Sequence, residues 1–377
     1  MGRIYLPHAE QFDLMNENLQ KIANALAMDM DISTWAGIQK AVRVGVAPDL
    51  IPVGTPLLVK HSVYGERLYD VVAHNHFKSA HDPNAHTMTL LCHDNLATVQ
   101  FDAPEAFYYA DAELPPGTYN FTLAATYSSW EVGTYQFVLT QALPAGGQLC
   151  ISGQANTALT SLQVNAYANR SSTTATESVS ITKGNGGTSL GTFGVELNYV
   201  HRVSYGSNNY KESAIRQFLN SASIAGSVWS PRTKFDRPPS WMTTLAGFVG
   251  GFEDDFLSVV GEVVVPCAAN NAYESPDSTT IKNTKYTVTD KFYLASQGEI
   301  FGVFSDTVAD DSVLFPYYEG ATNTDYIKYA SGSARGWWLR SPYSRNADSL
   351  RIVRLDGSLN PSAANTTPGF APVCTIM

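Results

Sequence analysis

The C-terminal segment, residues 336–377, constrains the fold most strongly, because two apolar stretches bracket a polar one. The first stretch, residues 336–342, reads Gly-Trp-Trp-Leu-Arg-Ser-Pro, and the second, residues 368–376, reads Pro-Gly-Phe-Ala-Pro-Val-Cys-Thr-Ile. Two adjacent indoles bury a large area, and the second stretch is typical of a turn followed by a short terminal strand. Both stretches are therefore predicted to belong to the core.

Between these stretches, residues 343–367 show neither a helical face nor sustained strand alternation. Asp356 and Gly357 form a turn signal between two candidate short strands, at residues 350–355 and from about residue 358. Irregular polar segments on a rigid frame are where binding residues usually lie. The pattern predicts an exposed hairpin or loop that binds a ligand.

Three motifs of this region carry a resemblance. They are Trp337-Trp338-Leu339-Arg340-Ser341-Pro342, Asp356-Gly357-Ser358-Leu359 and Gly369-Phe370-Ala371-Pro372. Together they resemble the C-terminal variable region of proteins diversified by retroelements. In that family a reverse transcriptase miscopies template adenines, so that asparagine codons become codons for many other residues on a C-type-lectin-like fold. The resemblance covers roughly residues 196–377 and implies varied contact residues on a fixed scaffold.

The composition of residues 343–367 gives an internal check. Changing the two adenines of an AAC or AAT codon never produces Lys, Glu, Gln, Trp or Met, and none of these occurs in the segment. From their share of the whole chain, roughly three would be expected in a window of this length. A loop that simply prefers small polar residues explains the same absence.

The resemblance implies a binding face within residues 343–367. Aromatic, arginine and small polar side chains there would supply stacking, bidentate and adaptable hydrogen-bonding contacts. Leu350 and Ile352 alternate along a strand, so each is either core or contact. The predicted ligand-binding residues are Tyr343, Ser344, Arg345, Asn346, Asp348, Ser349, Leu350, Arg351, Ile352, Arg354, Leu355, Asn360, Pro361, Ser362, Asn365, Thr366 and Thr367. The predicted frame residues are Trp337, Trp338, Ala347, Val353, Asp356, Gly357, Ser358 and Leu359.

Residues 1–47 are predicted to form a helical oligomerisation or attachment segment. Apolar residues three and four positions apart form a seam over about two heptads, at Phe12, Met15, Leu19, Ile22 and Leu26. This seam favours either one amphipathic helix docked on its own domain or a short oligomerising bundle. The resemblance to trimeric phage tail proteins favours a homotrimer.

Residues 48–195 are predicted to form a β-rich scaffold domain, an antiparallel sandwich or barrel. Strand-like runs at residues 55–60, 68–73, 87–91, 118–124 and 134–140 are separated by Pro/Gly turns. The Ser/Thr-rich residues 155–192 predict two long strands with a glycine turn, or a flexible passage to the next domain.

Residues 196–377 are predicted to form the ligand-binding domain. We expect helices at residues 211–219 and 241–248, with Ile215, Phe218 and Leu219 on one face of the first, and strands at residues 259–265 and 290–296. The predicted fold class is α+β, with a C-type-lectin-like domain that shares its broad fold with formylglycine-generating enzymes. Fold analogy alone transfers no activity.

Charge and residue spacing narrow the possible functions. A net charge of -10 and a pI near 5.2 argue against nucleic-acid binding. No apolar run approaches the roughly 20 residues of a membrane span, so a soluble protein without membrane insertion is expected. There is neither a GxSxG elbow nor a paired-carboxylate spacing, so no enzymatic activity and no cofactor are predicted.

Cysteines and histidines offer two further alternatives. The four cysteines are predicted to be buried thiols, with a disulfide between Cys267 and Cys374 as the competing interpretation. The region from His74 to His93 holds five histidines beside Cys92 and Asp94, and His74 and His76 share one strand face. Because His81 and His86 lie in a loop-like stretch, we expect solvated or hydrogen-bonded histidines, with a bound metal as the alternative.

These observations predict a diversified receptor-binding protein of a phage or prophage tail. Its partner would be a bacterial cell-surface protein or glycan, and it would be located in the virion or soluble in the producing bacterium. The alternatives are a structural virion protein and a fixed-specificity carbohydrate-binding lectin. The Glu-Pro-Asn or Gln-Pro-Asp triplet and the Trp-Asn-Asp motif of calcium-dependent sugar lectins are missing from the sequence, which disfavours calcium-bridged recognition.

Overall fold

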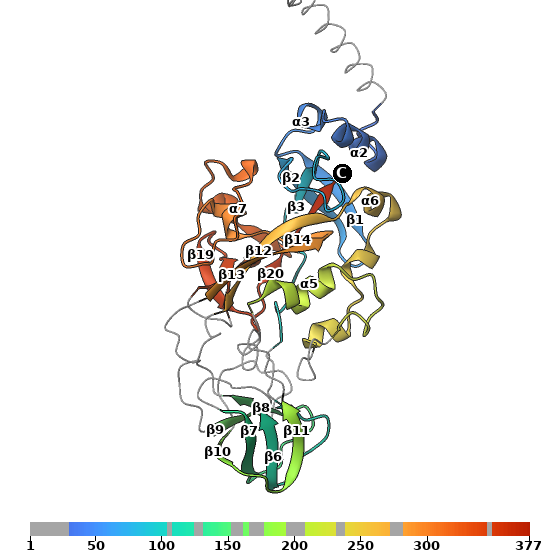
Figure 1. Ribbon diagram of the computed structural model, residues 1–377. Coiled ribbons are helices and arrows are strands. Elements are labelled where there is room, and N and C mark those ends of the chain that lie inside the picture. The colour runs from blue at the N-terminus through green and yellow to red at the C-terminus, as the bar shows by residue number, and fades with distance from the viewer. Residues whose placement is uncertain are drawn as a thin grey trace, which may run out of the picture.

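The computed structural model describes residues 30–103, 108–123, 131–151, 161–165, 177–193, 208–230, 238–271, 282–344 and 349–377. Within these ranges the fold is α+β: strands predominate, helices are few and short, and the sheets curl around two hydrophobic cores. Figure 1 shows the larger body above and a smaller sheet of β6 to β11 below it. The predicted seam from Phe12 to Leu26 lies outside the described residues.

Two short helices begin the described chain, α2 (Trp35–Arg43) and α3 (Ala47–Leu50). Thr34 starts α2 because its side chain accepts a hydrogen bond from the Gly37 backbone N–H. One face of α2 is buried, and the Trp35 ring lies 4.7 Å from the ring of Phe256 in α6 (Asp254–Val259). Hence α2 packs onto the larger core.

The first sheet has the order β1-β2-β3-β21-β14. Its strands are β1 (Pro56–His61), β2 (Gly65–His74), β3 (Met88–Cys92), β21 (Pro372–Ile376) and β14 (Phe292–Leu294). Every residue of β3 and β21 is buried, as expected of central strands that are covered on both faces. The predicted terminal strand is confirmed, and it lies antiparallel to both β3 and β14.

This sheet differs from the predicted division into residues 48–195 and 196–377. Strands β1 to β3 lie in one sheet with the chain's last strand, and their side chains share one core with the C-terminal helices. The physical reason is that β3 is buried on both faces and has a partner strand on each edge: β2 of the scaffold range pairs with one edge, and β21 from the C-terminus pairs with the other. The strand runs at residues 55–60, 68–73 and 87–91 were predicted correctly, but their sheet partners were not.

The second sheet has the order β19-β18-β17-β20-β4. Its strands are β19 (Leu359–Ala363), β18 (Ser349–Val353), β17 (Trp337–Pro342), β20 (Gly369–Phe370) and β4 (Ala97–Thr98). The predicted hairpin around Asp356 and Gly357 is confirmed, with β18 antiparallel to β19 and Ile352 opposite Asn360. Two further hairpins are β12 (Val263–Asn271) with β13 (Lys282–Asp290), and β15 (Lys328–Ala330) with β16 (Ser333–Arg335).

Short helices cover the larger body, and one of the two predicted helices is confirmed. Helix α5 (Ala214–Leu219) buries Ile215, Phe218 and Leu219, as the spacing predicted. The helix expected at residues 241–248 is instead two 3-10 turns, η3 (Ser240–Thr243) and η4 (Phe248–Gly251), which its glycines and short apolar spacing allow. The remaining helical elements are η2 (Tyr210–Glu212), α7 (Gln297–Phe301), η5 (Pro316–Tyr318) and η6 (Asn323–Tyr326).

The smaller sheet has the order β11-β6-β7-β10-β9-β8-β5 and its own core, which contains Phe121, Phe137 and Leu162. Its strands are β5 (Tyr108–Tyr109), β6 (Gly117–Leu123), β7 (Gly133–Leu139), β8 (Gln148–Ile151), β9 (Ser161–Asn165), β10 (Glu177–Lys183) and β11 (Thr188–Phe193). The predicted Gly turn links β10 to β11, but these strands pair with β7 and β6 rather than with each other. All described pairs here are antiparallel except β11 with β6.

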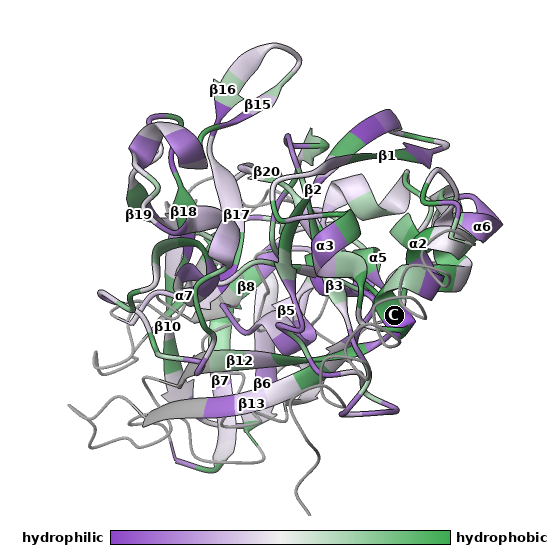
Figure 2. Ribbon diagram, turned by 90° about the horizontal axis from the view of Figure 1, so that it is seen from above, coloured by the Kyte–Doolittle hydropathy of each residue, from purple (hydrophilic) through white to green (hydrophobic). Residues whose placement is uncertain are grey.

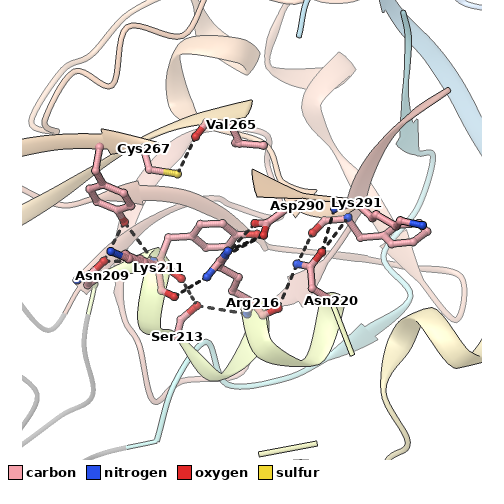
Figure 3. Close-up of polar contacts among 12 residues, drawn as sticks. Asn209, Lys211, Ser213, Arg216, Asn220, Val265, Cys267, Asp290 and Lys291 are labelled. Atoms are coloured by element: carbon pink, nitrogen blue, oxygen red, sulfur yellow. Dashed lines mark hydrogen bonds and ion pairs between the residues drawn. The ribbon is translucent and has the colours of Figure 1, made fainter. Parts of the chain in front are cut away.

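A buried ion pair ties α5 to the β12–β13 hairpin (Figure 3). Arg216 Nε lies 2.9 Å and 3.0 Å from the two carboxylate oxygens of Asp290, and Arg216 Nη2 lies 2.7 Å from Asp290 Oδ1. Burial raises the pKa of Asp290, and Arg216 opposes this. Asn220 continues the network by accepting from the backbone N–H of Lys291 and donating to the Phe292 carbonyl. These contacts serve to hold the helix on the hairpin.

The cysteines bear out the prediction of buried thiols where the structure describes them. Cys92, Cys267 and Cys374 are free and buried, so the alternative disulfide between Cys267 and Cys374 is wrong. Each lies within the larger core, where burial raises its thiol pKa. The Cys150 side chain lies outside the described part. None of the helices that the structure describes is long and apolar enough to cross a bilayer.

Candidate functional site

Strand β17 anchors the predicted binding region to the larger core. Trp337 and Trp338 are fully buried, as predicted, and their indole N–H groups donate to the carbonyls of Tyr326 at 3.0 Å and Val99 at 2.8 Å. Both rings are buried and both indole N–H groups are hydrogen-bonded, so these two large side chains fix the position of the strand. The site therefore rests on a rigid strand.

Arg340 fixes the same strand from its other end. Its Nη1 donates to Glu299 Oε2 at 2.7 Å and to the Leu294 carbonyl at 2.8 Å, and its Nε donates to the Pro266 carbonyl at 3.0 Å. Asp310 lies 3.7 Å from Nη2. Burial opposes the charged guanidinium, but the Glu299 and Asp310 carboxylates outweigh this effect and raise the pKa of Arg340. The arginine joins β17, β14 and α7 at one buried point.

The turn from β18 to β19 is held by its own hydrogen bonds and by a close contact below it. Asp356 Oδ1 accepts from Ser358 N at 3.1 Å and from Ser358 Oγ at 2.6 Å, which lowers the pKa of Asp356. Gly357 has a φ of 78°, and a Cβ there would lie 1.6 Å from the Asn323 carbonyl oxygen. The predicted frame residues of the turn are thus fixed by sterics and hydrogen bonding.

A groove of about 320 Å³ opens beside this hairpin, and we name it the hairpin groove. Six of the predicted contact residues line it, and the remainder of its lining comes from β4, β16 and the approach to β20. The lining residues are Thr98, Ala334, Arg335, Gly336, Ile352, Arg354, Leu355, Ser362, Thr366, Thr367 and Pro368. Figure 2 shows the β15–β16 hairpin projecting on the side of the body that carries β17, β18 and β19.

Three predicted contact residues prove to be buried. Leu350 is fully buried, which decides its open assignment in favour of the core. Ser349 and Arg351 are almost fully buried, which corrects their assignment to an exposed face. Leu350 packs into the core because β18 is covered on both faces at this end. The Arg351 guanidinium lies 5.4 Å from the Tyr343 ring centre and its Nε donates to Gln297 Oε1 at 3.2 Å. Arg351 therefore stabilises the hairpin from its inner side.

The other predicted residues that the structure describes do not line the groove. Tyr343, Ser344, Asn360, Pro361 and Asn365 are half-buried. The Asn365 carbonyl accepts from Gln100 Nε2 at 2.8 Å, which holds the segment after β19 against the N-terminal half. Arg345, Asn346, Asp348 and the frame residue Ala347 lie outside the described residues.

Sequence reasoning missed the groove residues contributed from outside the hairpin. Arg335 ends β16 just before the Trp337 frame, and the Ser331-Gly332 turn, with φ values of 50° and 77°, was the local signal for that hairpin. Thr98 reaches the groove because β4 pairs with β20, a contact between segments about 270 residues apart that no local pattern reveals.

The five histidines from His74 to His93 each contact a different residue. His74 Nε2 is 3.0 Å from the Ile51 carbonyl, His86 Nδ1 is 3.2 Å from Asn75 Oδ1, and His93 Nδ1 is 2.7 Å from Asp70 Oδ2. The His76 ring packs against the Phe315 ring, and His81 Nε2 lies 3.5 Å from a carboxylate oxygen of Glu262. Across the described ranges no group of three or more His, Cys, Asp or Glu residues has the geometry to hold a metal ion.

Comparison with known proteins assigns the C-terminal part of the chain to a family. Residues 171–377 match a family described as a domain of unknown function, DUF6273. Neither a curated protein nor a solved structure matches the chain. The matched range contains β17 to β21, and with them the frame and most of the hairpin groove. Because the match spans more than half of the 377 residues, the chain belongs to the DUF6273 family.

Proposed function

We propose that this protein is a non-enzymatic ligand-binding protein whose contact surface is the β18–β19 hairpin and the groove beside it. Its C-terminal part would be a C-type-lectin-like scaffold of the retroelement-diversified kind. Its ligand would be a protein or glycan receptor on a bacterial cell surface. The protein would be encoded by a phage or prophage, and it would be located in the virion tail or, before release, soluble in the producing bacterium.

The observation that carries this proposal is that six predicted contact residues meet at one groove beside a buried frame. Ile352, Arg354, Leu355, Ser362 and Thr366 line this groove, together with Thr367. Of the predicted frame, Trp337, Trp338, Val353 and Gly357 are buried, whereas Asp356 lies exposed in the turn. A varied surface needs this separation, because substitutions at exposed positions change stability little, whereas substitutions in a packed core change it strongly.

The arrangement of the sheets is compatible with a lectin-like scaffold. The terminal strand β21 is an interior strand of the first sheet, between β3 and β14, and the second sheet presents the hairpin on a separate edge. Fixing both ends of a binding segment in central strands leaves the segment free to vary. A homotrimer remains part of the proposal through the resemblance, and several weak sites on one particle would gain affinity through multivalency.

The encoding locus provides the first test. We expect an adjacent reverse-transcriptase gene and a near-copy of the codons for residues 336–375 that differs from the gene only where the copy carries adenine. The structure makes this sharper: differing codons are expected at groove positions such as Arg354, Leu355 and Ser362, and not at Trp338, Arg340 or Gly357. A near-copy whose differences fall on the buried positions would contradict the proposal.

A binding experiment provides the second test. Phage-displayed libraries varied at Arg354, Leu355, Ser362 and Thr366 are selected on whole cells of several bacterial strains. We expect different strains to enrich different residues at these positions. The matched control library varies Glu66, Arg67, Lys60 and Glu319, which are exposed and outside the groove, and it is expected to show no strain-dependent enrichment. Equal enrichment from both libraries would reject the hairpin as the contact surface.

A further inference from the structure

We infer that the hairpin groove binds an acidic sugar, with Arg335 and Arg354 receiving its carboxylate. This inference rests on the proposed function, since it names the ligand class of the same site. Arg335 comes from β16, outside residues 343–367, and Arg354 comes from the turn after β18. The two guanidinium groups therefore reach one groove from two different hairpins.

The charge of the groove is the first argument. Both arginine side chains are exposed, and within the described part of the chain neither forms an ion pair with a carboxylate. Asp356 in the same turn interacts electrostatically with Arg354 without forming an ion pair, and its Oδ1 accepts hydrogen bonds from Ser358. Among the described residues that line the groove there is no Asp or Glu. Two exposed arginines without an ion pair in the described part of the chain favour an anion at this place, although the whole chain has a net charge of -10.

The size and the remaining lining argue for a sugar. A volume of about 320 Å³ is at the lower end of the range for small-ligand sites, which suits one ring rather than an extended chain. Four hydroxyl-bearing residues, Thr98, Ser362, Thr366 and Thr367, line the groove together with the apolar Ile352. The Ser362 and Thr366 hydroxyl groups lie 2.7 Å apart and hydrogen-bond to each other. A pyranose has the same mixture, with hydroxyl groups at its rim and C–H groups on its faces.

An aromatic side chain beside the groove adds to this fit. Tyr329 lies directly opposite Ala334 in the β15–β16 hairpin, and Ala334 lines the groove. Directly opposed residues of an antiparallel pair project on the same face. Tyr329 is 47% exposed, so its ring is available for stacking on a sugar face.

The alternative ligand, an acidic peptide, fits the edge of the sheet less well. Extended peptides commonly bind by adding a strand to an exposed sheet edge. Both edge strands of the sheet, β19 and β4, contribute residues to the groove. Pro361 in the middle of β19 has no N–H to donate, and β4 is only two residues long. An acidic sugar needs no such ladder, because arginine and hydroxyl side chains supply its contacts.

The position of Arg335 has a consequence for specificity. If residues 343–367 vary, Arg335 and Thr98 do not, because both lie outside that segment. Their contacts would give every variant the same preference for a negative group. The varied residues would then select among acidic sugars rather than between acidic and neutral ones.

The test uses the full-length chain and three immobilised polymers. Alginate, a polymer of uronic acids, is compared with neutral dextran and with poly-L-glutamate by biolayer interferometry at low and moderate salt. We expect binding to alginate, at least ten-fold weaker binding to poly-L-glutamate, and none to dextran. Each single replacement, Arg335→Gln and Arg354→Gln, is expected to weaken alginate binding about ten-fold or more, the effect of losing a charged hydrogen bond.

Two controls make the outcome decisive. Arg67→Gln removes an exposed arginine on β2 outside the groove and is expected to leave alginate binding unchanged. Arg335→Lys keeps the charge but not the fork geometry, and we expect it to recover only part of the affinity. Equal binding of alginate and poly-L-glutamate, equal losses in Arg67→Gln and Arg335→Gln, or no alginate binding at all would each overturn the inference.

The locus experiment separates this inference from the proposed function. A template with adenine-restricted differences, combined with no alginate binding, would remove the acidic-sugar inference alone. Arginine-dependent alginate binding without such a template would keep the groove as a sugar site of fixed specificity and remove the diversified binder.

Discussion

The replacement Glu299→Gln tests whether the buried ion pair at Arg340 holds the binding frame in place. In the native protein both carboxylate oxygens of Glu299 face the Arg340 guanidinium, with Oε2 at 2.7 Å from Nη1, and both side chains are fully inaccessible to solvent. Oε2 also accepts from the Ser296 N–H at 2.9 Å, at the start of α7. Glutamine keeps the size of the side chain but removes its charge.

The expected loss follows from the geometry that remains. Removing one member of a buried pair commonly costs about 3–5 kcal/mol, because the other charge stays buried without compensation. Asp310 still lies 3.7 Å from Arg340 Nη2, so the lower end of that range, about 3 kcal/mol, is expected. For a body of this size the loss corresponds to a fall in Tm of roughly 6–12 °C.

Differential scanning calorimetry and urea titration measure this loss. Because the larger and the smaller body have separate cores, only the transition of the larger body is expected to move. The matched control is Glu319→Gln, an exposed carboxylate, with an expected change below about 0.5 kcal/mol. Asp310→Asn is expected to fall between the two. A loss below about 1 kcal/mol for Glu299→Gln would refute the expectation that neutralising Glu299 leaves the Arg340 charge buried without compensation.

Three further predictions concern the core and its titrating groups. Leu350→Ala is expected to cost about 2–5 kcal/mol in urea titrations, whereas Leu355→Ala, at a position 61% exposed, should change the free energy of unfolding by less than about 0.5 kcal/mol. Burial, with a contribution from Arg340, lowers the pKa of His76 from 6.5 to about 4, so the unfolded chain binds more protons between these pH values and stability falls as the solution is acidified through them. In His76→Phe the loss between pH 7 and pH 4.5 should be smaller by about 2–3 kcal/mol, and an identical loss would contradict the assignment. Three thiols should resist iodoacetamide in the native protein and react in urea, as followed site by site by mass spectrometry: Cys92, Cys267 and Cys374.

The sequence was most informative where local pattern and burial coincide. Strand runs such as residues 55–60 and 134–140 are rich in apolar and β-branched residues and lie between Pro/Gly turns, and they appear as β1 and β7. Gly357 was placed correctly in its turn because Asp-Gly is a hairpin turn signal, and the structure adds that a Cβ there would meet the Asn323 carbonyl. Trp337 and Trp338 were predicted to be core because two indoles are rarely left in solvent.

The predictions from the sequence were wrong or incomplete where segments distant in the chain pack together. Nothing in the local pattern of β3 shows that its partner is β21, about 280 residues later, so the division near residue 195 cut through one sheet. The same limit hid Thr98 and Arg335 from the candidate site. On β18, the pattern allowed Leu350 to be contact or core, and burial on both faces of that strand decided for core.

Burial also explains how such a scaffold could tolerate a changing surface. A domain has a stability of only about 5–15 kcal/mol, so a varied site must cost little at each position. Arg354, Leu355, Thr366 and Thr367 are exposed, and changes at such positions usually lie within about 0.5 kcal/mol each, or about 2 kcal/mol for all four together. A single broken contact at Arg340 would cost more than that sum. Variation confined to the groove would therefore leave most of the stability intact, whereas a single change in the frame would remove a large part of it.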